Sequence, residues 1–103
     1  MAFKDSYPVT EGHVLVSPLR HTPSFFDLGA SEQKACFMLL ENLKETTMKK
    51  DPRVTGFNIG VNDGRDAGQT IMHCHIHLIP RRKGDVADPR GGIRHTIPSG
   101  GFY

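Results

Sequence analysis

The sequence has 103 residues, 37% hydrophobic and 23% charged, which favours a single globular domain over residues 1–103 and excludes a disordered chain. Thirteen Lys and Arg against 11 Asp and Glu give a formal net charge of +2, too balanced to favour nucleic acid as a partner. No run of 18 apolar residues is present and the first residues lack the apolar stretch of a secretory signal, so we expect no membrane partner and a cytoplasmic protein. Two cysteines are too few for a disulfide framework, which agrees with that compartment.

The first half of the chain predicts a short strand followed by one long helix. Residues 12–17 form an apolar run that Pro18 stops, as expected for a strand. Apolar residues then recur at helical spacing, which predicts an amphipathic helix over 31–49 with Ser31 as its N-cap. Its apolar positions are Ala35, Met38, Leu39 and Leu43. The helix should end near Asp51, because Pro52 follows.

The second half predicts two strands and a tail. Residues 55–62 alternate apolar and small or polar side chains, and 70–79 form a second strand closed by Pro80. Between them, 62–68 is rich in turn residues. Residues 80–103 hold five glycines and three prolines and predict an irregular basic tail, with a short strand near Ile93. A hairpin-like 55–79 beside one helix indicates an α+β fold with an antiparallel sheet.

Three of the six histidines lie within five residues, at positions 73, 75 and 77. Successive side chains of a strand point to opposite faces, so the three histidines should share one face and line a polar groove. The residues between them would then enter the core. These are Cys74, Ile76 and Leu78.

Two chemistries suit this row of histidines, and both stay open on spacing alone. Zinc could bind a pair of them with His13 or Asp66, but not all three, because His73 and His77 would lie about 13 Å apart in a strand. Alternatively, the central imidazole attacks phosphorus while its neighbours bind charge or move protons. The spacing favours nucleophilic catalysis.

The segments on both sides of the histidines add a possible phosphate site. Gly68, Gln69 and Thr70 lead into the strand, and a glycine backbone with a threonine hydroxyl can bind phosphate oxygens. The tail carries a basic set that is either a solvated end or a contact for a charged substrate. Its members are Arg81, Arg82, Lys83, Arg90 and Arg94.

Together these motifs resemble the histidine triad (HIT) superfamily. Residues 73–79 match its pattern of three alternating histidines with apolar residues between them. Residues 62–73 resemble the family's approach to the triad, and 8–16 resemble its upstream strand with a fourth histidine, His13. The resemblance covers roughly residues 3–83, and the tail over 83–94 is similar to that of microbial dinucleoside-polyphosphate hydrolases of the family.

The resemblance implies an antiparallel sheet that continues across a homodimer. It also implies hydrolysis at the α-phosphate of AMP-linked substrates such as diadenosine polyphosphates, through a nucleotidyl-histidine intermediate. The alternatives are an adenosine phosphoramidase, a nucleotidyl transferase, or a nucleotide-binding regulatory protein with little turnover. No tightly bound cofactor or metal site is implied, although Mg²⁺ could arrive with the substrate. Nucleobase and leaving group are not assigned.

The resemblance also implies a role for individual residues. His75 would be the nucleophile, His77 would contact the phosphate and the leaving-group oxygen, and His73 and His13 would support them. The nucleotide-binding positions would be Asp5, Asn62, Gly68, Gln69 and Thr70. Among these, Asp5 would hold the ribose hydroxyls.

Overall fold

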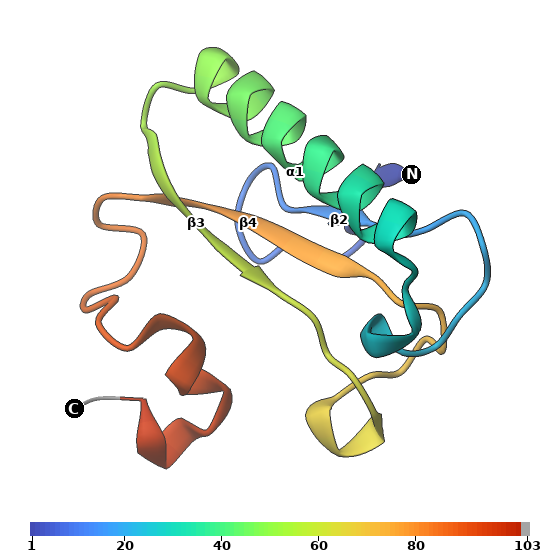
Figure 1. Cartoon of the computed structure of the whole chain (residues 1–103). Helices are drawn as coiled ribbons and strands as arrows, with labels where there is room; N and C mark the ends of the chain where they lie inside the picture. The colour runs from blue at the N-terminus through green and yellow to red at the C-terminus, as the bar shows by residue number, and fades with distance from the viewer. Residues whose placement is uncertain (102–103) are drawn as a thin grey trace.

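A computed structural model, described here for residues 1–101, has one long helix packed on an antiparallel four-stranded sheet (Figure 1). The strand order is β1-β2-β4-β3, and every neighbouring pair is antiparallel. In chain order the elements are β1 (Ala2–Lys4), β2 (Val14–Val16), α1 (Ala30–Lys50), β3 (Val54–Gly60) and β4 (Ile76–Arg82). The predicted α+β class is confirmed, as is the antiparallel pairing of the two strands predicted within 55–79. β1 was not predicted.

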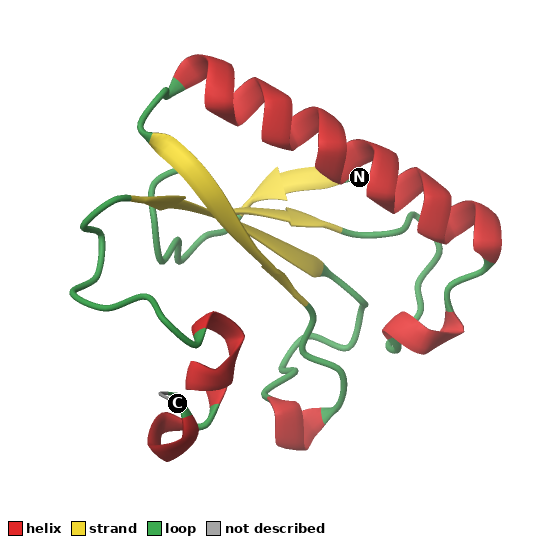
Figure 2. Cartoon of the chain, turned by 60° about the vertical axis from the view of Figure 1, so that its left-hand side comes forward, coloured by secondary structure: helices red, strands yellow, loops and turns green. Residues whose placement is uncertain are grey.

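Helix α1 covers one face of the sheet (Figures 1 and 2). The opposite face, called the uncovered or open face below, is free of α1, and a short 3₁₀ helix near the C-terminus approaches the sheet at β3. Helix α1 begins after Gly29, so the prediction of Ser31 as N-cap is wrong. Glu32 satisfies this end instead, because its carboxylate accepts the Gly29 N–H at 2.9 Å. The predicted apolar face is also partly wrong: Ala35 and Met38 are exposed. The side that meets the sheet carries Cys36, Leu39, Leu40 and Leu43.

The core lies between α1 and the middle of the sheet. Val16 of β2 and Ile76 of β4 are buried against Cys36 of the helix. Leu78, two residues after Ile76 along β4, is 1% exposed. Because side chains alternate along a strand, the residues between them point to the uncovered face. One strand thus contributes both to the core and to the open side.

The strand predicted at 70–79 is displaced toward the C-terminus. β4 starts at Ile76 because its neighbours end there: Val16 of β2 pairs with Ile76, and Gly60 of β3 pairs with His77. β4 then continues past Pro80 to Arg82, so the prediction that Pro80 closes the strand is wrong. Pro80 is tolerated because β2 has no residue opposite it; their last pair is Val14 with Leu78.

Short strands and 3₁₀ helices complete the chain. The strand predicted at 12–17 is shorter, spanning Val14–Val16. The strand predicted near Ile93 is a 3₁₀ helix over Gly92–Thr96, whose N–H groups bond carbonyls three residues back. This segment contacts β3, where a Cβ on Gly60 would lie 3.6 Å from the Ile93 side chain. Within residues 1–101, none of the helices is sufficiently long and apolar for a membrane span.

Candidate active site

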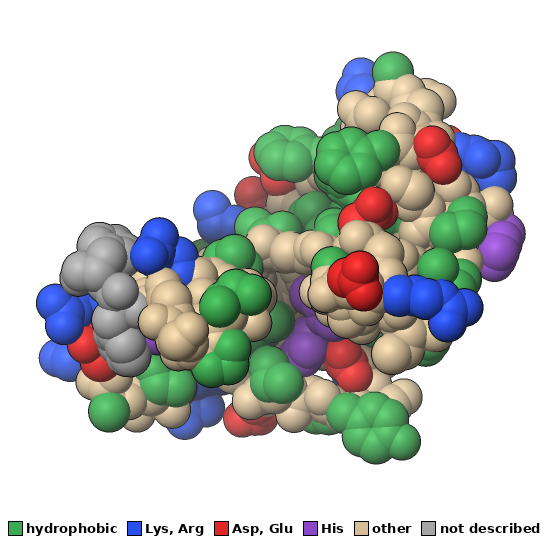
Figure 3. Space-filling model, turned by 90° about the horizontal axis from the view of Figure 1, so that it is seen from below, with side chains coloured by type: hydrophobic (Ala, Val, Ile, Leu, Met, Phe, Trp, Pro, Cys, Tyr) green, Lys and Arg blue, Asp and Glu red, His purple; other side chains and the backbone are tan. Residues whose placement is uncertain are grey.

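His13, His77 and Asp5 form a compact cluster at the uncovered face of the sheet. His13 Nε2 lies 2.9 Å from His77 Nδ1, and the Asp5 carboxylate lies 3.4 Å from the former nitrogen and 3.9 Å from the latter. His13, just before β2, is 4% exposed. Figure 3 shows histidine side chains in a hollow between two raised parts of the surface. The structure therefore brings His13, predicted from a distant segment, into direct contact with the triad.

His75 joins this cluster from the segment directly before β4. The His75 and His77 ring centroids are 5.3 Å apart in an edge-on arrangement. His75 Nδ1 lies 2.8 Å from the backbone carbonyl oxygen of His73. A carbonyl oxygen only accepts hydrogen bonds, so Nδ1 carries the proton and the lone pair of neutral His75 is on Nε2. That nitrogen is the one that can attack an electrophile.

The ring of His73 does not join His77, which corrects the prediction of three histidines on one face of one strand. Only His77 lies within β4. The His73 ring lies against His21 with centroids 5.2 Å apart, and its Nε2 donates to the Pro18 carbonyl at 3.0 Å. The physical reason is the lack of a neighbouring strand before Ile76: the Cys74 N–H bonds the Thr22 carbonyl at 2.7 Å, outside the sheet. His73 supports the site through its backbone carbonyl.

A chain of hydrogen bonds fixes which ring nitrogen of each histidine carries a proton. The Val9 N–H donates to His13 Nδ1 at 3.2 Å, so neutral His13 is protonated on Nε2. His13 Nε2 then donates to His77 Nδ1, which leaves the proton of neutral His77 on its Nε2. His75 therefore offers a lone pair while His77 offers a donor. These are complementary roles on neighbouring rings.

Burial lowers the pKa of His77, and the adjacent His13 and His75 lower it further; Asp5 opposes them. His77 is consequently neutral near pH 7. This charge state is the one that the hydrogen bond from His13 requires, because a doubly protonated His77 could not accept at Nδ1.

The loop before the triad presents some predicted residues and encloses others. Gly68 is left-handed, with φ 93°, and its Cβ position would lie 4.0 Å from the Asn62 amide. Asn62 and Thr70 are exposed, as ligand contact requires. Gln69 is only 4% exposed, and its amide bonds the backbone of Gly64, Pro23 and Ile71. The side chain of Gln69 therefore holds the loop rather than a ligand.

Asp5, His13 and His77 also offer ligand atoms within 4.8 Å of one another, the spacing of a metal site. The donor chemistry argues against a metal there. A histidine that binds a metal normally donates its other N–H to an acceptor, whereas His13 Nδ1 accepts a hydrogen bond from the Val9 N–H. Its Nε2 keeps its proton and is a poor ligand. Asp66, the other candidate from the sequence, is exposed and does not belong to this group.

Several basic residues predicted for the tail are paired with nearby carboxylates. Arg81 and Arg82 belong to β4 and contact Asp85 and Asp51. Arg90 bonds Asp88 at 2.8 Å while 72% exposed. The tail is thus less strongly cationic toward the site than its sequence predicts.

The sequence reasoning missed the groups that orient the histidines. They are the Val9 N–H and the carbonyls of Pro18 and His73, which are backbone atoms and leave no sequence signal. Asp63 was also missed: its carboxylate accepts from Ser24 and from the Phe25 N–H, and so ties the loop to the first half of the chain. The sequence feature that could have pointed to Asp63 is its position directly before Gly64 in the turn-rich segment.

The sequence of this chain is similar to those of known proteins. The chain is 45% identical over 86 residues to the nitrilase and fragile histidine triad fusion protein of Caenorhabditis elegans, covering 84% of this chain and 19% of that protein. It is 40% identical over 87 residues to the asymmetrical bis(5'-nucleosyl)-tetraphosphatase of Schizosaccharomyces pombe, covering 84% of this chain and 47% of the yeast enzyme. The chain thus spans less than half the length of either relative.

Solved structures match in the same way. The crystal structure of the C. elegans fusion protein superposes with a TM-score of 0.77 at 41% identity, covering 95% of this chain and 23% of that one. A HIT family protein from Bacillus anthracis gives 0.75 at 36% identity, covering 82% and 59%. The family model of the HIT domain matches residues 1–84, so this chain belongs to the HIT domain family.

Proposed function

We propose that this chain hydrolyses AMP-linked substrates such as diadenosine polyphosphates at the α-phosphate, through a nucleotidyl-His75 intermediate. The observation that carries the proposal is the hydrogen bond from His75 Nδ1 to the His73 carbonyl, which leaves the Nε2 lone pair available. The tetraphosphatase named among the relatives supports the substrate class. The first half of the reaction forms a bond between Nε2 and the α-phosphorus and breaks the bond to the leaving-group oxygen.

His77 stabilises the group that leaves. Its Nε2–H donates a hydrogen bond to the departing oxygen, where negative charge develops. A polyphosphate departs as an anion, so this hydrogen bond suffices without complete proton transfer. Water then attacks the phosphorus and breaks the P–N bond: its oxygen stays on AMP, one proton is released to the solvent, and the electron pair of the broken bond returns His75 to its neutral form.

The loop and Asp5 bind the nucleotide in this proposal. Backbone amides near Gly68, with Thr70 and Asn62, contact the phosphate oxygens. Asp5 holds the ribose hydroxyls through its carboxylate, which lies beside both His13 and His77. Ribose and phosphorus would then be bound on adjacent sides of one cluster.

We also propose that the protein holds no resident metal or other cofactor, and that Mg²⁺ arrives on the polyphosphate of the substrate. The argument is the proton that His13 keeps on Nε2. Elemental analysis of the purified protein tests this directly. One zinc per chain, retained after dialysis, would overturn it and favour the zinc alternative.

We infer a homodimer in which β3 edges from two chains extend the sheet. β3 lies at the end of the strand order, so its outer edge is unpaired within residues 1–101. Beside it, a groove of about 540 Å³ is lined by exposed apolar residues, among them Phe26, Phe37 and Ile59. Such an edge favours pairing with another strand.

Sedimentation tests the dimer. The variant Ile59→Arg should sediment as a monomer, whereas Leu19→Arg, at an 85% exposed position outside that groove, should sediment like the wild type. A wild-type monomer, or an Ile59→Arg dimer, would overturn this interface.

Product analysis tests the activity. The wild-type protein should convert diadenosine tetraphosphate into AMP and ATP, and a rapid acid quench should trap labelled AMP on His75. Faster cleavage of adenosine phosphoramidate would favour the phosphoramidase alternative, and AMP transfer to an added phosphate acceptor would favour the transferase. Tight nucleotide binding without turnover would indicate a regulatory protein and contradict the proposal.

A further inference from the structure

The turn between β1 and β2 orients His13. The N–H of Val9 in this turn donates to His13 Nδ1 at 3.2 Å, and the His13 N–H returns to the Thr10 carbonyl at 3.2 Å. Through His13, the turn determines the proton position on His77. A turn that shifted would leave His13 free to adopt the other tautomer, with its proton on Nδ1.

This turn has little apolar packing of its own. Val9 is 70% exposed, and Glu11 is also exposed. It is held instead by the end of β4. The Thr10 hydroxyl donates to the Pro80 carbonyl at 2.8 Å, and Gly12, with φ 90°, lies so close that an added Cβ would be 3.3 Å from the Pro80 ring.

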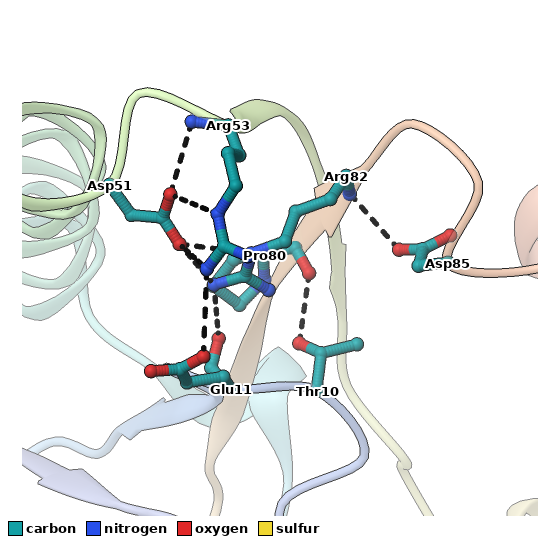
Figure 4. A network of polar contacts seen from close by, with 7 residues as sticks. All are labelled: Thr10, Glu11, Asp51, Arg53, Pro80, Arg82 and Asp85. Carbon is teal, nitrogen blue, oxygen red and sulfur yellow. Dashed lines mark hydrogen bonds and ion pairs between the residues drawn. The ribbon is translucent and has the colours of Figure 1, made fainter.

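Arg82 supplies a further attachment of the turn (Figure 4). Its Nη2 donates to the Glu11 carbonyl at 2.9 Å, two residues before His13. The same guanidinium bonds Asp51 through Nε at 3.1 Å, and the Arg82 side chain is only 15% exposed. Asp51 caps the C-terminal end of α1, where its N–H bonds the Thr47 carbonyl. Arg82 thus connects the end of the helix to the turn.

We propose that Arg82 is a positioning residue: oriented by Asp51, it holds the Glu11 carbonyl so that His13 keeps its proton directed at His77. The catalytic consequence rests on the proposed function. The effect on the His13 tautomer does not, because it is a property of the protein alone. Arg82 itself touches none of the catalytic histidines, so its removal leaves the chemical groups intact and changes only their orientation.

Arg53 provides a matched control. It also bonds Asp51, through Nε and Nη2 at 2.9 Å each, so its removal takes away the same kind of ion pair. However, Arg53 is 70% exposed and reaches the turn only at the Glu11 carboxylate, 3.8 Å away. Arg53→Ala should therefore reproduce the lost charge without releasing the Glu11 carbonyl.

The kinetic experiment compares two AMP esters whose leaving groups differ in basicity, the 4-nitrophenyl ester and the phenyl ester. A hydrogen bond from His77 matters more for the more basic phenolate. Arg82→Ala should lower kcat for the phenyl ester by about tenfold and for the 4-nitrophenyl ester by less than about threefold, with Arg53→Ala within about twofold of wild type for both. Arg82→Lys, which retains a charged donor, should fall between Arg82→Ala and wild type.

Nitrogen NMR of the imidazole rings tests the same inference without turnover. Wild type and Arg53→Ala should show His13 protonated on Nε2, and Arg82→Ala should show a mixture of tautomers. An unchanged His13 tautomer in Arg82→Ala, an equal loss on both esters, or the same losses in Arg53→Ala would overturn the inference. If the wild type cleaves neither ester and also fails on diadenosine tetraphosphate, the proposed function fails while the tautomer measurement still decides the role of Arg82. If Arg82→Ala does not fold, Arg82→Lys supplies both readouts.

Discussion

The two faces of the sheet differ although one strand builds both. Toward α1, Ile76 and Leu78 of β4 are buried with Val16. On the other side, His77 stands between them in sequence and meets His13 and Asp5 through polar contacts. The face covered by α1 is stabilised by buried apolar side chains, whose close packing tolerates little change in side-chain volume. The open face depends on which groups donate and which accept hydrogen bonds, so it tolerates little change in the chemical type of a side chain. Substitutions on the two faces should therefore fail in different ways.

The largest expected effect is on the open face. His75→Ala should reduce turnover by at least about 10³-fold, because it removes the covalent route, while stability changes little for this half-exposed ring. Steady-state rates and thermal unfolding of the same preparation measure both quantities. Retained turnover would exclude His75 as the nucleophile.

The covered face should show the opposite result. Leu78→Ala should lower the free energy of unfolding by about 2–5 kcal/mol, since Leu78 is 1% exposed and its loss leaves a cavity. Urea denaturation measures this, with Leu19→Ala, at an 85% exposed position, as the control expected within about 0.5 kcal/mol of wild type. Equal effects of the two changes would contradict the core assignment.

A smaller effect should appear in the pH dependence of stability. The pKa of His77 is lowered in the folded protein, first by burial and then by His13 and His75. The unfolded chain therefore takes up a proton on this residue at higher pH than the folded one does, and the free energy of unfolding should fall as pH drops below about 6.5. Urea denaturation at about pH 7 and about pH 5.5 should show a shallower fall in His77→Gln than in wild type.

The carboxylates change the free energy of unfolding in a separate, more acidic pH range. Arg53, followed by Arg82, holds the pKa of Asp51 well below its usual range, and Arg81 does the same for Asp85. Their contribution to the free energy of unfolding is present above about pH 4 and is lost below it, so it leaves the His77 comparison unaffected.

The His77 prediction would be contradicted if the free energy of unfolding fell equally between the two pH values in wild type and in His77→Gln. That result would mean that the pKa of His77 is the same in the folded and the unfolded chain.

The smallest expected effect concerns the tail. Arg90 is exposed and already bonded to Asp88, so Arg90→Ala should change kcat/KM for diadenosine tetraphosphate by less than about fivefold. Added salt should reduce even that difference, because exposed pairs are screened. A much larger loss would show that the tail reads the polyphosphate after all.

The helix and the main antiparallel pair were predictable from hydrophobic spacing and alternation along the chain. His13 and Asp5, which meet His77 in the structure, were predicted as catalytic or nucleotide-binding residues only through the resemblance to the HIT family. The start of β4 was not predictable from the sequence, because it is determined by where the two neighbouring strands end. β2 ends at Val16, which pairs with Ile76, and β3 ends at Gly60, which pairs with His77. The sequence also could not assign tautomers. The proton on His75 follows from the carbonyl of His73, and the proton on His13 from the N–H of Val9.

The satisfied amide of Gln69 has a consequence for binding kinetics. Its three hydrogen bonds to the backbone of Gly64, Pro23 and Ile71 order the loop before any ligand arrives. A loop ordered in advance loses little conformational entropy when a phosphate binds, so association need not wait for the loop to close. Differences in affinity among nucleotides should therefore arise mainly from how slowly each one dissociates.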